Sequence, residues 1–379
     1  MSFPVSEEVQ LFREAARRFA EEQIAPHARD WDRAGRFPDE LIAELGAGGF
    51  MGILVPEEYG GAGANYQAFA AVLEELARHD GGLALAVEAH NGLACQHILI
   101  AGTEAQKKQY LPPLAAGEHI GSWCLSEPNS GSDAIAMETI AVRDGDGWIL
   151  NGGKQFITNG DRAGIYVVMA VTDPDASPRG ITAFIVERDA TGLTRGKPEE
   201  KLGMRSSDTV ALHFENLRIP DACRLGEVNR GFEDVKRVLE HGRVMISALS
   251  VGFARGALED ASRYAHERKA FGRTLAEFQL IQQKLADMAT QLAAGSLMLH
   301  HAAALLDQGR CTVQQAAMTK LFTSEMATRA CLDAIQILGG YGYLREYNVE
   351  RYLRDAKLCE IGEGTSEVMR ILIARELGR

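Results

Sequence analysis

One uninterrupted helical stretch limits the folds open to this chain. Residues 232–268 read FEDVKRVLEHGRVMISALSVGFARGALEDASRYAHER, a helical pattern that no proline interrupts. More helical segments follow it, broken at Gln308-Gly309, at the GGYGY of residues 339–343 and at the GEG of residues 362–364. Four consecutive helices with short connections are typical of a bundle, so we expect a four-helix bundle at this end of the chain.

The first third of the chain also predicts helices. Ser6 can cap a helix whose apolar stripe runs from Phe12 to Phe19, and a second helix is expected from Pro38 to Gly46. The segment from Tyr66 to Ile100 is rich in alanine and leucine and is too apolar for a surface helix. We therefore expect this segment to be buried.

Between about residues 121 and 231 the pattern changes to short β-branched runs. Ile165–Thr172, Ile181–Glu187 and Thr209–Phe214 predict strands, and turn signals such as DGDG and TDPDASPRG separate the runs of this region. The sequence therefore predicts an α+β multidomain fold with an N-terminal helical domain (1–122), a central β-barrel-like domain (123–232) and a C-terminal four-helix bundle (233–379).

Composition limits the kinds of partner and the cellular compartment that are expected for this chain. The chain has 40 basic and 52 acidic residues, and this net charge of −12 argues against nucleic acid or an anionic membrane as the main partner. The beginning of the chain has no uninterrupted apolar run, and no stretch predicts a membrane span. Six scattered cysteines without a C-x-x-C pair indicate reduced thiols. We therefore expect a cytoplasmic protein.

The usual nucleotide and metal signatures are absent from the sequence. It contains no G-x-x-x-x-G-K-[ST], no G-x-G-x-x-G between a strand and a helix, and no H-E-x-x-H. Spaced Cys/His ligand sets are absent as well, so no metal site is predicted.

Four polar segments each allow two interpretations. WCLSEPNSGSDA (123–134) can turn hydroxyls and backbone N–H groups toward a ligand, or it can be a plain polar loop. KQFITNG (154–160) can present Phe156 and Thr158, or it can be a strand with a hairpin turn. ERKAFGRTLAEFQ (267–279) can bind an anion such as a pyrophosphate or complement a helix dipole. QILGGYGY (336–343) permits close backbone approach or caps a helix.

A fifth segment places a carboxylate on a glycine-flanked corner. Glu363 stands between Gly362 and Gly364, directly before Thr365 and Ser366 open the last predicted helix. Taken alone, such a residue is most often part of a solvated turn.

Together these segments resemble the acyl-CoA dehydrogenases, flavoenzymes that desaturate acyl-CoA thioesters. The similar stretches, in the order of that family from about residue 55 to 370, are PEEYGGAG, LSEPNSGSD, ILNGGKQFITNG, KLGMRSSDT, ERKAFG, QILGGYGY, RDAK and EGTSE. The helix–β–helix layout is similar as well. Eight matches in order would otherwise require eight independent coincidences.

The resemblance implies an FAD site between the β domain and the C-terminal helices. Ser126 stands where the family usually has threonine, and Phe156 stands where it often has tryptophan. Arg268, Gln279 and the Gln336 segment resemble contacts donated by a neighbouring subunit, which implies a homotetramer built as a dimer of dimers. The implied FAD contacts are Trp123, Leu125, Ser126, Ser132, Phe156, Ile157, Thr158, Arg268, Phe271, Gln279, Gln336, Gly339, Gly340, Thr365 and Glu367.

The resemblance also implies the reaction. A base removes the α-proton of the thioester while the β-hydride passes to flavin N5, and Glu363 matches the position of that base. A second family position for the base matches Gly242, which has no carboxylate. Glu240 lies about 200° around the helix from Gly242 and is expected to be an i,i+3 partner of Arg243. The implied substrate contacts are Ser132, Glu240, Arg243 and Gly364.

The implied function is an FAD-dependent acyl-CoA dehydrogenase with electron-transfer flavoprotein as its electron acceptor. The strings SEPNSGSDA, GGYGYLREY and SEVMRILI favour a short-chain or short branched-chain acyl-CoA, and glutaryl-type decarboxylation stays open. Two alternatives are an acyl-CoA oxidase that uses oxygen and a non-catalytic scaffold that keeps the fold without the chemistry.

Overall fold

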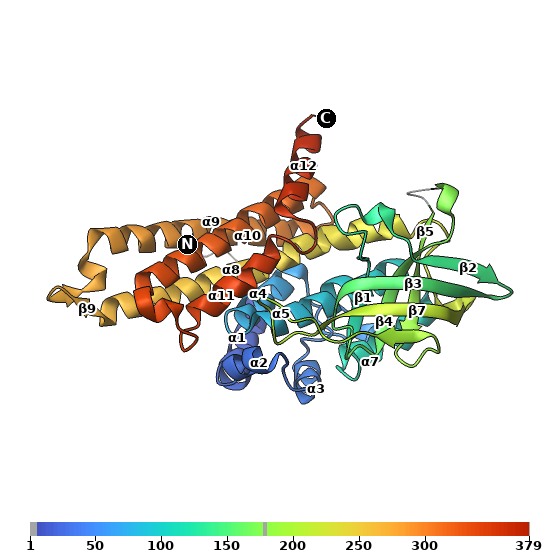
Figure 1. Cartoon of the computed structure of the whole chain (residues 1–379), viewed down its shortest axis with the longest axis horizontal. Helices are drawn as coiled ribbons and strands as arrows, with labels where there is room; N and C mark the ends of the chain where they lie inside the picture. Colours follow the sequence, from blue (N-terminus) through green and yellow to red (C-terminus); the bar gives the residue numbers. More distant parts are fainter. Residues whose placement is uncertain (1–5, 177–179, 379) are drawn as a thin grey trace.

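The computed structural model describes residues 6–176 and 180–378, and Figure 1 shows a helical part, a sheet and a long helical bundle in chain order. The helices that precede the sheet are α1 (Glu7–Phe19), α2 (Ala28–Ala34), α3 (Glu40–Ala47), α4 (Tyr66–Ala77), α5 (Gly81–Glu88), α6 (Gln96–Ala101) and α7 (Glu104–Ala115). Between some of them lie π-helical turns at Ala20–Ile24 and Ala89–Cys95.

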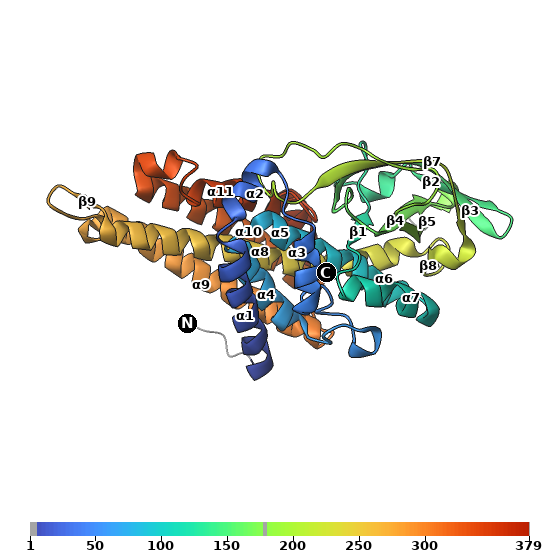
Figure 2. The same cartoon turned by 90° about the horizontal axis from the view of Figure 1, so that it is seen from below.

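The capping and burial predicted for this first part are confirmed. The Ser6 hydroxyl accepts a hydrogen bond from the Val9 N–H at 3.3 Å, which satisfies a donor that the first turn of α1 leaves free. The apolar helix α4 packs against α1 and against two later helices, α8 (Gly231–Glu267) and α9 (Gln279–Asp307) (Figure 2). Its fully buried Glu74 lies within 3.0 Å of Arg13, so a charge pair ties α4 to α1 inside the core.

The central part is an eight-stranded sheet in the order β6-β7-β3-β2-β4-β5-β8, with β1 paired in parallel to β4. The Asn159-Gly160 turn after β3 does not join a hairpin, because β2 lies between β3 and β4. The strands are β1 (Gly121–Cys124), β2 (Ile140–Asp144), β3 (Gly147–Thr158), β4 (Ile165–Val171), β5 (Ile181–Glu187), β6 (Leu193–Arg195), β7 (Thr209–Pro220) and β8 (Arg224–Leu225).

The long predicted helix is α8 (Gly231–Glu267), and its length agrees with the absence of proline. It packs against three of the helices that follow, as expected for a bundle. A small hairpin of β9 (Lys269–Ala270) and β10 (Arg273–Thr274) joins it to α9 at the end of the molecule farthest from the sheet (Figure 1). The later helices are α9 (Gln279–Asp307), α10 (Val313–Leu338), α11 (Val349–Cys359) and α12 (Ser366–Leu377).

Two further properties of the described residues bear on function. None of their helices is long and apolar enough to cross a membrane. All six cysteines are free, and four of them are buried.

Candidate active site

The Glu363 corner is an ordered turn with unusual backbone angles. Glu363 has a φ of 57° and Gly364 a φ of 101°, so a residue with a side chain occupies the left-handed region beside a glycine. Thr365 then caps α12, because its hydroxyl accepts a hydrogen bond from the Val368 N–H at 3.3 Å. Backbone strain of this kind persists only where the surroundings hold it, and it is found preferentially at functional sites.

The carboxyl group of Glu363 points toward α8 at Gly242. Its Oε2 atom is inaccessible to solvent and has no hydrogen-bond partner among the described residues. A Cβ atom at Gly242 would lie 2.3 Å from that oxygen and 2.9 Å from Leu93 Cδ2. The two positions that the sequence offered for a base therefore face each other across one small space, and only one side chain fits there.

Two cations hold the backbone of this corner. Lys320, which is 1% exposed on α10, donates from Nζ to the Gly364 carbonyl at 2.6 Å. Arg243 donates from Nε to the Glu363 carbonyl at 3.4 Å. Burial raises the pKa of the Glu363 carboxyl to about 7, although the nearby Lys320 and Arg243 act to lower it.

Glu240 lies one helical turn before Arg243 on α8. Burial, the larger effect, raises the pKa of Glu240, and the attraction of Arg243 lowers it. Thus Arg243 interacts with Glu240 as well as with the corner that carries Glu363.

One carboxylate near Glu363 escaped the sequence analysis. Glu88, at the end of α5, is fully buried, and neither of its side-chain oxygens has a hydrogen-bond partner among the described residues. Burial first, and then repulsion from Glu363, raises the pKa of Glu88 well above its ordinary range. A sequence signal existed, because Glu88 is a lone charge in the apolar run GGLALAVEAH.

The structure brings together two of the segments predicted to contact FAD. The Ser122 hydroxyl donates to the Thr158 carbonyl at 2.7 Å, and the Gln155 N–H donates to the Ser126 carbonyl at 2.9 Å. These bonds place the end of β1 beside the end of β3, with Phe156 66% exposed at a φ of 60°. Of the remaining predicted residues here, Trp123, Leu125 and Ile157 are buried, and Ser132 is exposed.

A buried ion pair that the sequence analysis missed supports the loop after β1. Lys154 donates from Nζ to Glu127 Oε1 at 2.6 Å and to the Leu125 carbonyl at 3.2 Å. The same carboxylate accepts from the backbone N–H groups of Glu138 and Thr139. The pair therefore fixes the loop immediately after Ser126, in which the sequence analysis placed the flavin contact Ser132.

Six of the other predicted FAD contacts lie at the far end of the bundle (Figure 1), whereas Thr365 and Glu367 lie at the start of α12 beside Glu363. The Phe271 ring is 94% exposed beside the β9–β10 hairpin, and the Arg268 guanidinium lies 5.6 Å from the centre of the Tyr341 ring. Within one chain this group does not meet the segments around Ser126. Its members are all exposed: Arg268, Phe271, Gln279, Gln336, Gly339 and Gly340.

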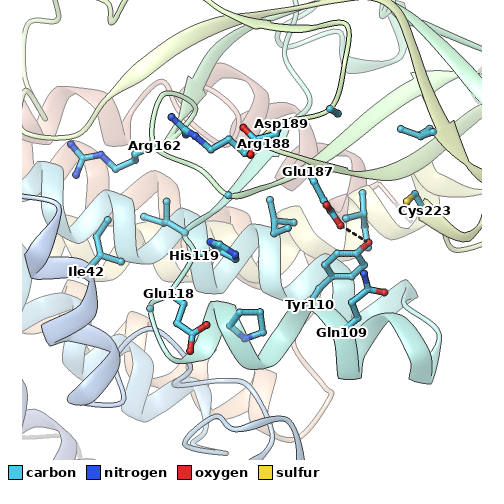
Figure 3. Close-up of a pocket in the computed structure, with 18 of the residues that line it drawn as sticks. Ile42, Gln109, Tyr110, Glu118, His119, Arg162, Glu187, Arg188, Asp189 and Cys223 are labelled. Carbon is cyan, nitrogen blue, oxygen red and sulfur yellow. Dashed lines mark hydrogen bonds between the residues drawn. The ribbon is translucent and has the colours of Figure 1, made fainter.

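A cavity of about 860 Å³ lies elsewhere, where α7 meets the sheet (Figure 3). Charged side chains including Glu118, Arg162 and Arg188 surround it, and Tyr110 donates to Glu187 at 3.4 Å in its wall. None of the residues predicted to bind flavin or substrate lines it. We therefore place the candidate active site at Glu363, on the chemistry of the residues there.

Comparison with known proteins identifies the class. Family models described as acyl-CoA dehydrogenase N-terminal, middle and C-terminal domains match residues 6–118, 122–217 and 229–378. The chain is 46% identical to a probable acyl-CoA dehydrogenase, YngJ, of Bacillus subtilis, and the match covers 100% of both chains.

Two solved structures are similar over the whole chain. Butyryl-CoA dehydrogenase from Megasphaera elsdenii superposes with a TM-score of 0.98 at 40% identity, with 100% of both chains covered. A chain from a study of the electron transferring flavoprotein of Acidaminococcus fermentans also gives a TM-score of 0.98, at 42% identity and with 100% of both chains covered. These matches define a flavin-dependent oxidoreductase. The chain belongs to the acyl-CoA dehydrogenase family, as its eight motifs indicated.

Among residues 6–176 and 180–378, no group of three or more His, Cys, Asp or Glu side chains is arranged to hold a metal ion.

Proposed function

We propose that this protein is an FAD-dependent acyl-CoA dehydrogenase that desaturates a short- or medium-chain, straight or branched acyl-CoA thioester, with Glu363 as its catalytic base. The observation that carries the proposal is the Glu363 carboxyl, whose Oε2 atom is buried, has no hydrogen-bond partner among the described residues and faces the glycine of α8. A carboxylate held in this way has an open lone pair for a proton.

The electrostatics around Glu363 suit the abstraction of a weakly acidic proton. A general base is most effective when its pKa is near the working pH, and burial brings the pKa of Glu363 to about 7. Lys320 and Arg243 favour its ionised form and hold the two carbonyls of the corner. In this proposal Glu363 takes the α-proton, and Ser132, Glu240, Arg243 and Gly364 contact the acyl-CoA.

The residues at the ends of β1 and β3 fit a flavin. Phe156 offers an exposed ring on the same paired segments that carry Ser126 and Thr158, which is the combination of apolar surface and polar groups that a flat, polar-edged ring requires. We propose that these residues, with Trp123, Ser132 and the other sequence-predicted contacts, hold FAD. When bound, the flavin accepts the two electrons that desaturation releases.

The exposed group around Arg268 supports an oligomer. The Phe271 ring is 94% exposed, and the group cannot reach the Ser126 segment of its own chain (Figure 1). We propose that a second copy of the chain completes each FAD site and that the assembly is a homotetramer. Thr365 and Glu367, at the start of α12, complete the set of predicted FAD contacts near Glu363.

The electron acceptor and the compartment complete the proposal. The likeness to a chain studied with an electron transferring flavoprotein supports such a protein as the acceptor. The net charge of −12 argues against nucleic acid as a partner, and the six free cysteines support a reducing compartment such as the cytoplasm.

Anaerobic mixing with a panel of acyl-CoA thioesters of different length and branching tests this function. The wild-type holoenzyme should lose its flavin absorbance with its substrate, and Glu363→Gln should bind flavin normally yet keep that absorbance. Glu325→Gln, which changes an exposed partner of Arg370, is the matched control and should behave as wild type. Turnover by Glu363→Gln would refute the role of Glu363, and reoxidation by air as fast as by the acceptor protein would indicate an oxidase.

A further inference from the structure

Glu88 and Glu363 form an isolated carboxyl pair in the core of the candidate site. A Cβ atom at Gly92, one helical turn after Glu88, would lie 2.8 Å from Glu88 Oε1. The Glu88 side chain therefore lies along its own helical segment, toward Gly92. Glu363, far from Glu88 in the sequence, reaches the same region. Its Oε2 atom and the Cδ2 atom of Leu93, which follows Gly92, lie next to the same position, Gly242. The two groups lie within hydrogen-bonding reach of each other.

The hydrogen bonds that the structure leaves unmade identify how the pair is protonated. Both oxygens of Glu88 and Oε2 of Glu363 are buried and lack a partner among the described residues. Two ionised carboxylates have only acceptors and cannot bond to each other. One added proton turns one member into a donor and gives one oxygen of each carboxyl a hydrogen-bond partner, which reduces the cost of burying unpaired polar atoms.

We propose that Glu88 carries a proton and donates a hydrogen bond to Glu363, so that Glu88 is a positioning residue that keeps the base ionised and aimed. The inference rests on the proposed role of Glu363 and assigns a second carboxyl to the same site. During the reaction the α C–H bond breaks, the α-proton bonds to Glu363, and the electron pair of that C–H bond stays with the substrate. Glu88 keeps its own proton. Release of the proton from Glu363 to solvent restores the pair.

The surrounding charges explain why the proton belongs to Glu88. Lys320 from α10 and Arg243 from α8 both lower the pKa of Glu363, and the buried Cys359 thiol of α11 is the other titratable group near it. Only burial and Glu363 act on Glu88, and both raise its pKa. The member beside the cations is therefore ionised, and the member without them is neutral.

The pH dependence of flavin reduction tests the pair through two variants. Glu88→Gln keeps a neutral hydrogen-bond donor. The acid limb of its pH profile for flavin reduction by butyryl-CoA should therefore coincide with that of wild type. Glu88→Leu fills the space without a donor, so its acid limb should move up by about 1 pH unit. Equal acid limbs in all three proteins, or equal shifts in both variants, would overturn the proposal.

Infrared spectroscopy of holoenzyme containing ¹³C-labelled glutamate tests the proton without any turnover. At about pH 8.5, above the pKa of Glu363, a labelled protonated-carboxyl band should appear in wild type and in Glu363→Gln. Glu88→Gln should lack that band, and its survival in this variant would contradict the assignment. Because this readout needs no substrate, a protein that fails to oxidise acyl-CoA would refute the proposed function and leave the carboxyl pair to be judged separately.

Discussion

A single methyl group at Gly242 should separate catalysis from folding. In Gly242→Ala the new Cβ would lie 2.3 Å from Glu363 Oε2, whereas an ordinary contact requires roughly 3.5 Å. The carboxyl group must therefore move by about 1 Å, because the backbone of α8 is packed on its buried side. A displacement of this size at a reacting group costs on the order of 100-fold in rate.

The same substitution should change stability little. Alanine is favoured over glycine inside a helix by about 1 kcal/mol, and the crowding against Glu363 and Leu93 costs about 1–3 kcal/mol. We therefore expect a change in the free energy of unfolding within about 2 kcal/mol. Flavin content should match that of wild type, because the substitution touches none of the predicted flavin contacts.

Stopped-flow measurement of anaerobic flavin reduction, together with thermal unfolding, checks both expectations. Gly256→Ala is the matched control on the same helix, since its Cβ would lie 2.9 Å from the Tyr352 ring and far from the base. The control should lose stability without losing the chemical step once folded. A Gly242→Ala enzyme that reduces its flavin at the wild-type rate would refute the placement of the Glu363 carboxyl against α8.

Three further predictions concern the Glu363 corner and the buried Asp355. The double variant Gly242→Glu with Glu363→Gly should recover part of the flavin reduction lost in Glu363→Gly, because both positions face one space; recovery no better than Glu363→Gly would count against this. Lys320→Met removes a cation that lowers the pKa of Glu363, so the acid limb of the pH profile for flavin reduction should move up by about 1 pH unit. The control Lys357→Met changes an exposed ion pair and should leave that pH profile unchanged. Burial raises the pKa of Asp355 to about 7, so the stability that this group contributes is full below about pH 4 and is lost as the pH rises to 7. In urea unfolding, the free energy of unfolding of Asp355→Asn relative to wild type should therefore increase by a few kcal/mol across that pH range. A difference that stays constant with pH would contradict this prediction.

Local sequence patterns were sufficient for several elements of the secondary structure. The proline-free stretch that became α8, the Ser6 cap of α1 and the β-branched runs of β4, β5 and β7 each depend on neighbours in the chain. Such patterns determine backbone conformation over a few residues at a time, and they do not place one element against another. The prediction that the segment from Tyr66 to Ile100 is buried succeeded for the same reason, because its apolarity is a local property.

The candidate site was only partly accessible to that reasoning. The eight motifs indicated Glu363 and the Ser126 and Phe156 segments through resemblance, whereas Glu88 carries no motif. Its importance arises because α5 and the corner before α12, far apart in sequence, bring two carboxyl groups close enough for each to change the pKa of the other. The Lys154–Glu127 pair was missed for a similar reason, since it joins residues of two separate segments.

The sequence by itself determined the element order, the family and the presence of one carboxylate at a glycine-flanked corner. The tertiary structure alone decided that this carboxylate is buried against Gly242, that Lys320 and Arg243 hold its backbone, and that Glu88 shares its surroundings. The physical reason is that periodicity and capping are short-range effects along the chain. The acidity of a side chain is determined by desolvation and by charges that packing brings within a few ångströms.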